Sequence, residues 1–333
     1  MTPLVRIQPT PMKSPNSIVL AYIESYAAED IYPFVVSLRN TGYEGKVVFF
    51  TNDVTPSCNQ LLKDYSIQNI PVSRIDLKGR YHFDGLLGQL LGLDSKPLIP
   101  DISINQRLSK VLASTHLAHT TIGRLLARFL WHCQSARFLY FEDFLRRNES
   151  YTRILISDVR DVVFQSNPFD LDVSDRLLVF EEHSAKPIDQ QPNNADWIRK
   201  LYGKQVLSEL SGLPVICCGV TIGSRNRVQE YLSLMNAHIV SNYSGWGTDQ
   251  GAHNFLVRKK HTSRTEVFSY GKGPAVHVGI APRSSIQTDR SGRVVNEDGQ
   301  PFSIVHQYDR HPDVEALLLD QLNQPKQPDT TLP

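Results

Sequence analysis

The sequence has no long hydrophobic run. No uninterrupted apolar stretch approaches the ~20 residues that a membrane-spanning helix needs. The N-terminus, MTPLVRIQPTPMKSP, is proline-rich and polar, and it lacks the apolar core of a secretion signal. From these two absences we expect a cytoplasmic protein without a transmembrane segment.

Cysteine is scarce, and neither sign of charge is in excess. The 333 residues include 35 Lys+Arg and 34 Asp+Glu, so the formal net charge is +1 and nothing indicates nucleic acid or an anionic membrane as a partner. The four cysteines do not have the spacing of a disulfide framework or a zinc site: Cys58, Cys133, Cys217 and Cys218.

Two glycine motifs that bind phosphate are also missing. The first predicted strand-to-helix turn, AYIESYAAED, contains no glycine, and no G-x-x-x-x-G-K-[ST] occurs anywhere in the chain. Gly85, Gly88 and Gly92 lie in a leucine-rich stretch and indicate close helix packing. These absences weigh against a dinucleotide-dependent dehydrogenase and against a P-loop protein.

The sequence does contain a regular alternation of short apolar runs and amphipathic stretches. Buried strands are predicted at 18–22, 47–50 and 154–156, and a helix at 28–40. This alternation predicts an α/β fold with a mostly parallel central sheet flanked by helices. Further predicted elements are helices at 122–130, 136–145, 193–201 and 249–258, a strand or hairpin at 216–222 that breaks at Gly219, and a last strand at 302–305.

Two carboxylates, Asp158 and Asp161, follow the strand at 154–156. Ligands of open α/β sheets collect at the carboxyl ends of the strands. Two acids held together there repel each other unless a cation or a proton intervenes, and a hard divalent ion that bridges to substrate phosphates is the simplest answer. In the alternative interpretation, Asp158 caps the next turn and Asp161 pairs with Arg160 or Arg153 in a structural ion pair.

A late histidine could complete such a metal site. His306, in SIVHQYDRH, follows an apolar strand, so we expect it to emerge at the same sheet edge as the acids. His277, in GPAVHVGIAP, has similar flanks and is the alternative ligand. Either residue could instead be an ordinary core or surface histidine.

Taken in order, these motifs resemble the nucleotide-diphospho-sugar glycosyltransferases with the GT-A fold, and most of all the retaining glycogenin-like and lipopolysaccharide galactosyltransferase families. The resemblance covers roughly residues 17–310. Two departures from the family pattern are a residue inserted into the D-x-D motif and the loss of the asparagine of N-x-G-V. The resemblance depends on four motifs: Asp158-Val-Arg-Asp161, Cys217-Cys218-Gly219-Val220, Asp249-Gln250 with Asn254, and His306.

The resemblance implies a role for each matching residue. Asp158, Asp161 and His306 would hold Mn²⁺ or Mg²⁺, and Asp249 and Gln250 would stand at the catalytic position. Because an amide is a poor nucleophile, Gln250 favours a front-side reaction over double displacement. Donor contacts are implied for Arg137, Asp158, Gly219, Trp246, Asn254 and Arg310.

Several of these residues have simpler interpretations. Arg137 could be a surface arginine on an amphipathic helix, and Gly219 could mark a bulge in an edge strand. Asp249 could only cap its helix, and Trp246 could be a core residue.

The implied activity is metal-dependent transfer of a sugar from a nucleoside diphosphate, with UDP favoured, to a saccharide or another hydroxyl acceptor, with retention. We expect a flexible arm over 1–16, one domain over 17–315 and a disordered tail over 323–333. Residues 17–165 of the domain would bind the nucleotide sugar, and 166–315 the acceptor.

Glu181 and Glu182, also at a strand end, keep an inverting reaction open. Two other classes remain as alternatives: a non-catalytic nucleotide-sugar-binding protein, and a metal-dependent nucleotidyltransferase or phosphohydrolase.

Overall fold

The structure is a computed structural model, and it describes residues 16–73, 111 and 120–323. The predicted arm and tail, apart from residues 16 and 323, lie outside the described residues, as do Gly85, Gly88 and Gly92. Among the described helices, none combines the length and the apolar character needed to cross a membrane.

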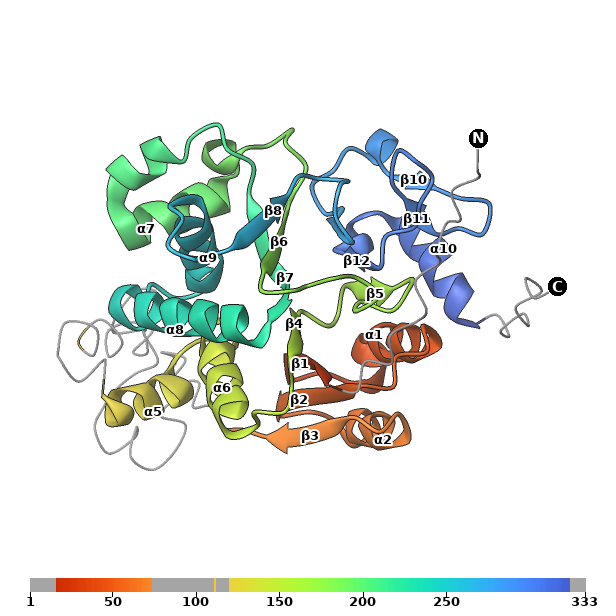
Figure 1. The fold of residues 1–333 in the computed structure, drawn as a ribbon, viewed down its shortest axis with the longest axis horizontal. Helices are drawn as coiled ribbons and strands as arrows, with labels where there is room; N and C mark the ends of the chain where they lie inside the picture. Colours follow the sequence, from red (N-terminus) through yellow and green to blue (C-terminus); the bar gives the residue numbers. More distant parts are fainter. Residues whose placement is uncertain (1–15, 74–110, 112–119, 324–333) are drawn as a thin grey trace, which may run out of the picture.

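A seven-stranded sheet runs through the molecule (Figure 1). All neighbouring strands are parallel except β7, which runs antiparallel to both β4 and β6. The apolar runs predicted as buried strands are indeed buried, as expected for strands that are covered on both faces. The predicted α/β fold with a mostly parallel sheet is therefore confirmed. The strand order is β3 (Gln68–Pro71), β2 (Lys46–Asn52), β1 (Ser17–Glu24), β4 (Arg153–Ser157), β7 (Ile216–Ser224), β6 (Leu177–Glu181) and β8 (Thr265–Phe268).

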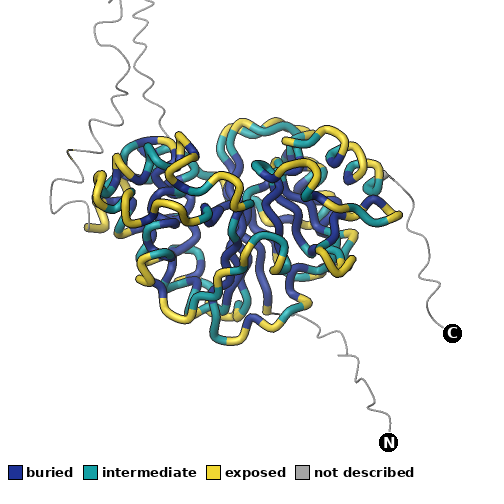
Figure 2. The backbone as a smooth tube through the Cα atoms, turned by 90° about the horizontal axis from the view of Figure 1, so that it is seen from above, coloured by how far each residue is buried: buried dark blue, intermediate teal, exposed yellow. Residues whose placement is uncertain are grey.

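Helices cover both faces of this sheet. Figure 1 shows one group of helices on one side of the strands and a second group on the other. The first group is α5 (Thr121–Leu130), α6 (Cys133–Arg147), α8 (Arg225–Asn242) and α9 (Thr248–Arg258), and the second is α1 (Ala28–Asn40) and α2 (Pro56–Asp64). Figure 2 shows the buried residues gathered along the strands between these layers. The predicted bounds of the helix at 28–40 are those of α1.

His306 does not lie on the central sheet, contrary to the sequence-based expectation. It ends β12 (Ile304–His306), the middle strand of a separate three-stranded sheet between β5 (Val162–Phe164) and β9 (Ala275–His277). Because β12 pairs antiparallel with β5, His306 stands opposite Val162, the residue after Asp161. The parallel pairing with β9 sets His306 beside His277. The histidine therefore reaches the acids through the strand that follows them.

β7 also differs from its prediction. It is continuous from Ile216 to Ser224 and lies inside the sheet, so Gly219 neither breaks the strand nor lies in an edge strand. The pairing with β6 does shift in register between Ile222 and Cys217, the segment that contains Gly219. The helix predicted at 193–201 is longer: α7 spans Pro192–Glu209 and kinks at Gly203, whose φ is 84°. The remaining elements are β10 (Gln287–Thr288), β11 (Val294–Val295), α10 (Pro312–Asn323) and the short 3₁₀ turns Ile188–Gln190, Arg283–Ser285 and Tyr308–Arg310.

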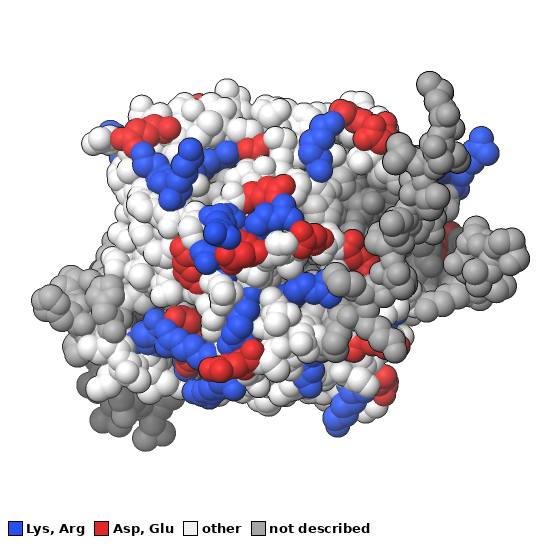
Figure 3. All heavy atoms as spheres, in the orientation of Figure 1, with Lys and Arg blue, Asp and Glu red and all other residues white. Residues whose placement is uncertain are grey.

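Charges of both signs alternate on the face shown in Figure 3, where basic and acidic side chains lie next to one another. Among the described residues, many charged side chains form surface ion pairs, for example Arg176 with Glu266 and Arg227 with Asp175. Such exposed pairs contribute little to stability.

Candidate functional site

Two carboxylates and an imidazole converge just beyond the end of β4. The Nε2 atom of His306 lies 3.4 Å from Oδ1 of Asp161 and 3.6 Å from Oδ2 of Asp158. One ligand atom from each of the three residues lies within 4.8 Å of the others. The structure therefore brings together the three residues that the sequence nominated as metal ligands.

The His306 ring is oriented by a second histidine. Its Nδ1 atom lies 2.8 Å from Nδ1 of His277, so the ring presents Nε2 to the two acids. An outer hydrogen bond of this kind is the usual way in which a metal-ligating histidine is held. Of the two candidate histidines, His306 thus faces the acids and His277 supports it.

Asp161 and His306 form a strongly interacting pair in the metal-free protein. Burial alone would raise the pKa of Asp161, but His306 and Arg310 outweigh it and hold this pKa at about 2. Burial would lower the pKa of His306, yet Asp161 and Cys217 raise it well above its usual value. A metal ion at this position would take the place of the proton on Nε2.

Arg137 is not a surface residue. Its side chain is only 5% exposed, and it forms an ion pair with Asp158 and another, at 3.4 Å, with Oδ2 of Asp249. Burial lowers the pKa of Arg137, but Asp158, Cys218 and Asp249 raise it by more. The guanidinium thus orients two acids of the site. It leaves the second oxygen of Asp158 facing His306.

Gly219 is required by its neighbours. A Cβ atom at this position would lie 2.3 Å from Cε1 of His306 and 2.7 Å from Oδ2 of Asp158. Real Cβ atoms do not approach other atoms so closely, so the bare backbone of β7 lets the ring and the carboxylate meet. The resemblance had implied that this glycine admits a sugar; in the structure it admits the two side chains.

α9 presents its polar residues to the part of β7 that extends beyond β4. Asn254 accepts a hydrogen bond from the Ile216 amide and donates one to the Ile216 carbonyl, both at 2.9 Å. Gln250 accepts from the Cys218 amide at 2.9 Å and donates to the Ile216 carbonyl at 2.8 Å. β6 pairs with one side of this segment, and the two side-chain amides bind its other side, beyond the end of β4. Asn254 is fully buried, and the structure does not bring it to the cavity described next.

Two cavities meet at the acids. The first, of about 460 Å³, lies between α7, α9 and the end of β12, and the second, of about 780 Å³, lies over the ends of β1 and β2. Asp158, Asp161 and Arg137 line both, together with Trp246 and Arg310, whereas Gly219, Asp249, Gln250 and His306 line the first. Apart from Asn254, all the predicted site residues therefore border one continuous hollow.

Trp246 is 54% exposed and meets Trp197 of α7 edge to face, with ring centroids 4.9 Å apart. It is therefore not a core residue.

Sequence reasoning missed most of the second cavity. Its wall includes Glu24 and Asn52 at the ends of β1 and β2, followed by Ser25 and Asp53, which adopt φ values of 57° and 50°. These residues follow the carboxyl ends of parallel strands, where ligands of open α/β sheets collect, so the argument that identified Asp158 could also have identified them. Residues in this left-handed region cluster at functional sites.

The first cavity has a further acid, Glu182. It is 6% exposed, and burial raises the pKa of its carboxyl group. Its neighbour Glu181 instead pairs with Arg258 at 2.7 Å. Of the two glutamates considered from the sequence, only Glu182 lines the cavity.

Comparison with known proteins adds little. No family model matches the chain, and no curated protein matches it. Among solved structures, the chain is similar to core-mannan synthase A (CmsA/Ktr4) from Aspergillus fumigatus in its Mn/GDP form, with 11% sequence identity over 78% of this chain and 74% of that chain and a TM-score of 0.38. A likeness this loose says nothing about the chemistry of the site.

Proposed function

We propose that this protein is a metal-dependent glycosyltransferase that moves a hexose or pentose from a nucleoside diphosphate to a hydroxyl acceptor. The observation that carries the proposal is the convergence of Asp158, Asp161 and His306 where two cavities meet. A donor has two parts, a nucleoside and a sugar, joined by a diphosphate. Two hollows that join at a cation site match that shape.

Two carboxylates and one neutral imidazole suit Mn²⁺ or Mg²⁺. Such an ion would act as a Lewis acid on the departing diphosphate. Arg310, whose positive charge lowers the pKa of Asp161, would add a second cationic group beside it. Asp158 would be held in place by Arg137, whose two terminal nitrogens bind the carboxylates of Asp158 and Asp249.

The two cavities would divide the substrates. Residues 17–165 supply Glu24, Asn52 and Asp53 to the second cavity, where we place the nucleoside, with UDP-sugars as the first donors to try. Residues 166–315 supply most of the walls of the first cavity, where we place the sugar and the acceptor. Asp249 lines that cavity, and its buried Oδ1 atom has no hydrogen-bond partner among the described residues, so we expect it to gain one from a sugar hydroxyl when the donor binds. Trp246 would stack on a sugar ring.

Both ends of the Gln250 amide are bonded to β7, so this residue has no group free to attack the sugar. This favours a front-side reaction with retention, in which the leaving phosphate accepts the acceptor's proton. Glu182 is the competing residue: a buried carboxylate with a raised pKa could serve as the base of an inverting reaction.

The test is a screen of UDP-, GDP-, ADP- and dTDP-sugars for thermal stabilisation in Mn²⁺, followed by turnover of each hit with saccharide acceptors. We expect one donor class to raise Tm only in the presence of metal, and its sugar to be transferred. Asp161→Asn should abolish both effects.

Stabilisation without turnover would indicate a binding protein. Nucleotide hydrolysis that does not depend on the sugar would indicate a phosphohydrolase. Either result would overturn the proposal.

A further inference from the structure

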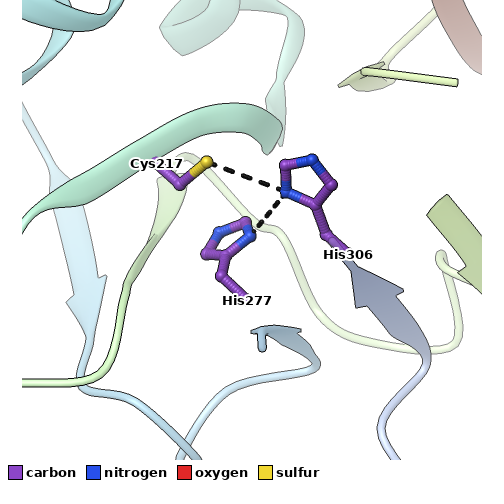
Figure 4. Close-up of side chains that lie close together, drawn as sticks. All are labelled: Cys217, His277 and His306. Carbon is purple, nitrogen blue, oxygen red and sulfur yellow. Dashed lines mark hydrogen bonds between the residues drawn. The ribbon is translucent and has the colours of Figure 1, made fainter. Parts of the chain in front are cut away.

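A second cluster of side chains that could hold a metal ion lies behind the first, on the other side of the His306 ring. Figure 4 shows Cys217 and His277 directed at the same nitrogen of His306. The distances to this Nδ1 atom are 3.7 Å from Sγ of Cys217 and 2.8 Å from Nδ1 of His277. All three ligand atoms lie within 4.8 Å of one another, and the three residues are 5%, 0% and 1% exposed in chain order.

These separations are close to those of a tetrahedral zinc site. With Zn–N bonds of about 2.0 Å and Zn–S bonds of about 2.3 Å, two nitrogens lie roughly 3.3 Å apart and a nitrogen and a sulfur roughly 3.6 Å apart. The two Nδ1 atoms of His277 and His306 must therefore move apart by about half an ångström. The distance between Sγ of Cys217 and Nδ1 of His306 already fits a zinc site. A thiolate with two imidazoles is a soft donor set that prefers Zn²⁺ to Mn²⁺ or Mg²⁺.

The cluster also has an entrance and a fourth ligand. Cys217 and His306 line the first cavity, so an ion can reach them from solvent. Glu182 lines the same cavity and forms an isolated backbone bridge with His277, and Cys217 is among the groups that act on the pKa of its carboxyl group. A carboxylate is an acceptable fourth zinc ligand.

We infer that Cys217, His277 and His306 form a second metal site, selective for Zn²⁺, that shares one imidazole with the Asp158–Asp161–His306 site and opposes its occupation. A neutral imidazole carries one hydrogen and one lone pair. When Nε2 binds a hard ion beside Asp161, the hydrogen stays on Nδ1 and is donated to His277. When Nδ1 binds Zn²⁺, the hydrogen stays on Nε2 and is donated to Asp161.

Only one of the two ions can therefore bind the His306 ring at a time, unless the ring loses the hydrogens of both its nitrogens. Zn²⁺ binding also displaces the thiol proton of Cys217 to solvent, so the thiolate supplies the electron pair of the Zn–S bond. The site of Cys217, His277 and His306, called the soft site below, is inferred from these three residues alone. The antagonism between the two sites rests on the proposed function. Zn²⁺ would inhibit the enzyme by removing the nitrogen ligand from the catalytic ion.

Co²⁺ is the probe for the soft site, because it replaces Zn²⁺ and gives an intense sulfur-to-metal absorption band only when a thiolate binds it. We expect the metal-free full-length protein to develop this band with one equivalent of Co²⁺ and lose it when Zn²⁺ is added. Cys217→Ser should abolish the band, and His277→Ala should weaken Co²⁺ binding at least about tenfold. Cys58→Ser, at a buried thiol in α2 that lines neither cavity, should leave the band intact. No band in the wild type, or an unchanged band in Cys217→Ser, would overturn the site.

The antagonism is tested by electron paramagnetic resonance of free aqueous Mn²⁺. One equivalent of Zn²⁺ should release bound Mn²⁺ from the wild type, and at least about tenfold more Zn²⁺ should be needed with Cys217→Ser. Equal release from both proteins would overturn the antagonism. If the protein binds no Mn²⁺ but shows the Co²⁺ band, the proposed function and the antagonism fail and the soft site stands.

Discussion

At the scale of single residues, the candidate site depends on one missing side chain. Gly219 lies in a strand that is buried on both faces. Because it has no Cβ, the His306 ring and the Asp158 carboxylate can occupy the position that a Cβ would take. Packed interiors have no slack for an added methyl group. The same strand contains a second crowded glycine, Gly223, where a Cβ would lie 2.9 Å from the carbonyl oxygen of Arg176.

These two glycines form a matched pair for mutagenesis. Gly219→Ala should weaken Mn²⁺ binding at least about tenfold, because the methyl group displaces the His306 ring. Gly223→Ala should lower the free energy of unfolding by about 1–3 kcal/mol and leave the Mn²⁺ affinity of the folded protein unchanged. Isothermal titration with Mn²⁺ and urea unfolding measure the two quantities. Equal Mn²⁺ affinity in the two variants would show that Gly219 does not shape the site.

Arg137 supports a second residue-scale prediction. Its guanidinium is buried between Asp158 and Asp249, and removing one partner of a buried ion pair leaves an uncompensated charge. We therefore expect Arg137→Met to lower the free energy of unfolding by about 3–5 kcal/mol. Adding Asp249→Asn should recover part of the loss, which urea unfolding of both variants can measure. A single variant as stable as the wild type would mean that the ion pairs are not formed in solution.

At the scale of elements, α9 and β7 are joined by side chains in place of a strand. β4 ends at Ser157, so the amide and carbonyl of Ile216 would lack partners without Asn254 and Gln250. The sequence did show that these two residues lie one turn apart on the same helical face. It could not show that the face meets unpaired backbone, because that depends on where a distant strand stops.

Asn254→Ala therefore tests the structural role of this helix. The loss of two buried hydrogen bonds should cost about 2–4 kcal/mol of unfolding free energy, with no change in the affinity for donor and metal. Asn242→Ala, in which a partly buried amide loses one bond to the His238 carbonyl, should cost no more than about 1 kcal/mol. Unchanged stability with weaker donor binding would instead support the donor contact that the family resemblance implied for Asn254.

The element scale also separates what the sequence could predict from what it could not. The apolar runs at 18–22, 47–50 and 154–156 and the helix at 28–40 follow from local periodicity, and the structure confirms them. β12 is three residues long, and its place in a small sheet beside β5 is set by long-range packing. The sequence thus predicted that His306 lies near the two acids, but it placed the histidine on the wrong sheet. The approach of Cys217 and His277 to the other side of the His306 ring had no signal in residue spacing.

At the scale of the whole molecule, stability should fall in mild acid because of a buried histidine in α9. His253 is fully buried, and burial lowers its pKa from 6.5 to about 3. Below pH 6.5 the His253 imidazole binds a proton in the unfolded chain but stays neutral in the folded protein. The free energy of unfolding therefore falls progressively as the pH drops from 6.5 to about 3. The slope approaches 1.4 kcal/mol per pH unit.

The matched variant is His253→Asn, which keeps a side-chain partner for the hydroxyl of Tyr231, 2.8 Å away, and does not titrate. Between pH 6.5 and pH 5, the wild type should lose about 2 kcal/mol more than this variant in urea unfolding. Parallel pH profiles for the two proteins would mean that His253 is protonated or exposed in the folded state.

The central claim is that Asp158, Asp161 and His306 hold one divalent ion on which the diphosphate of a sugar donor rests. Electron–nuclear double resonance of Mn²⁺ in the ternary complex with the donor found in the screen tests it most directly. The account predicts a ¹⁴N coupling from His306 together with ³¹P couplings from the donor, and loss of the nitrogen coupling alone in His306→Gln. A bound Mn²⁺ that shows phosphorus coupling but no nitrogen coupling in the wild type would contradict it.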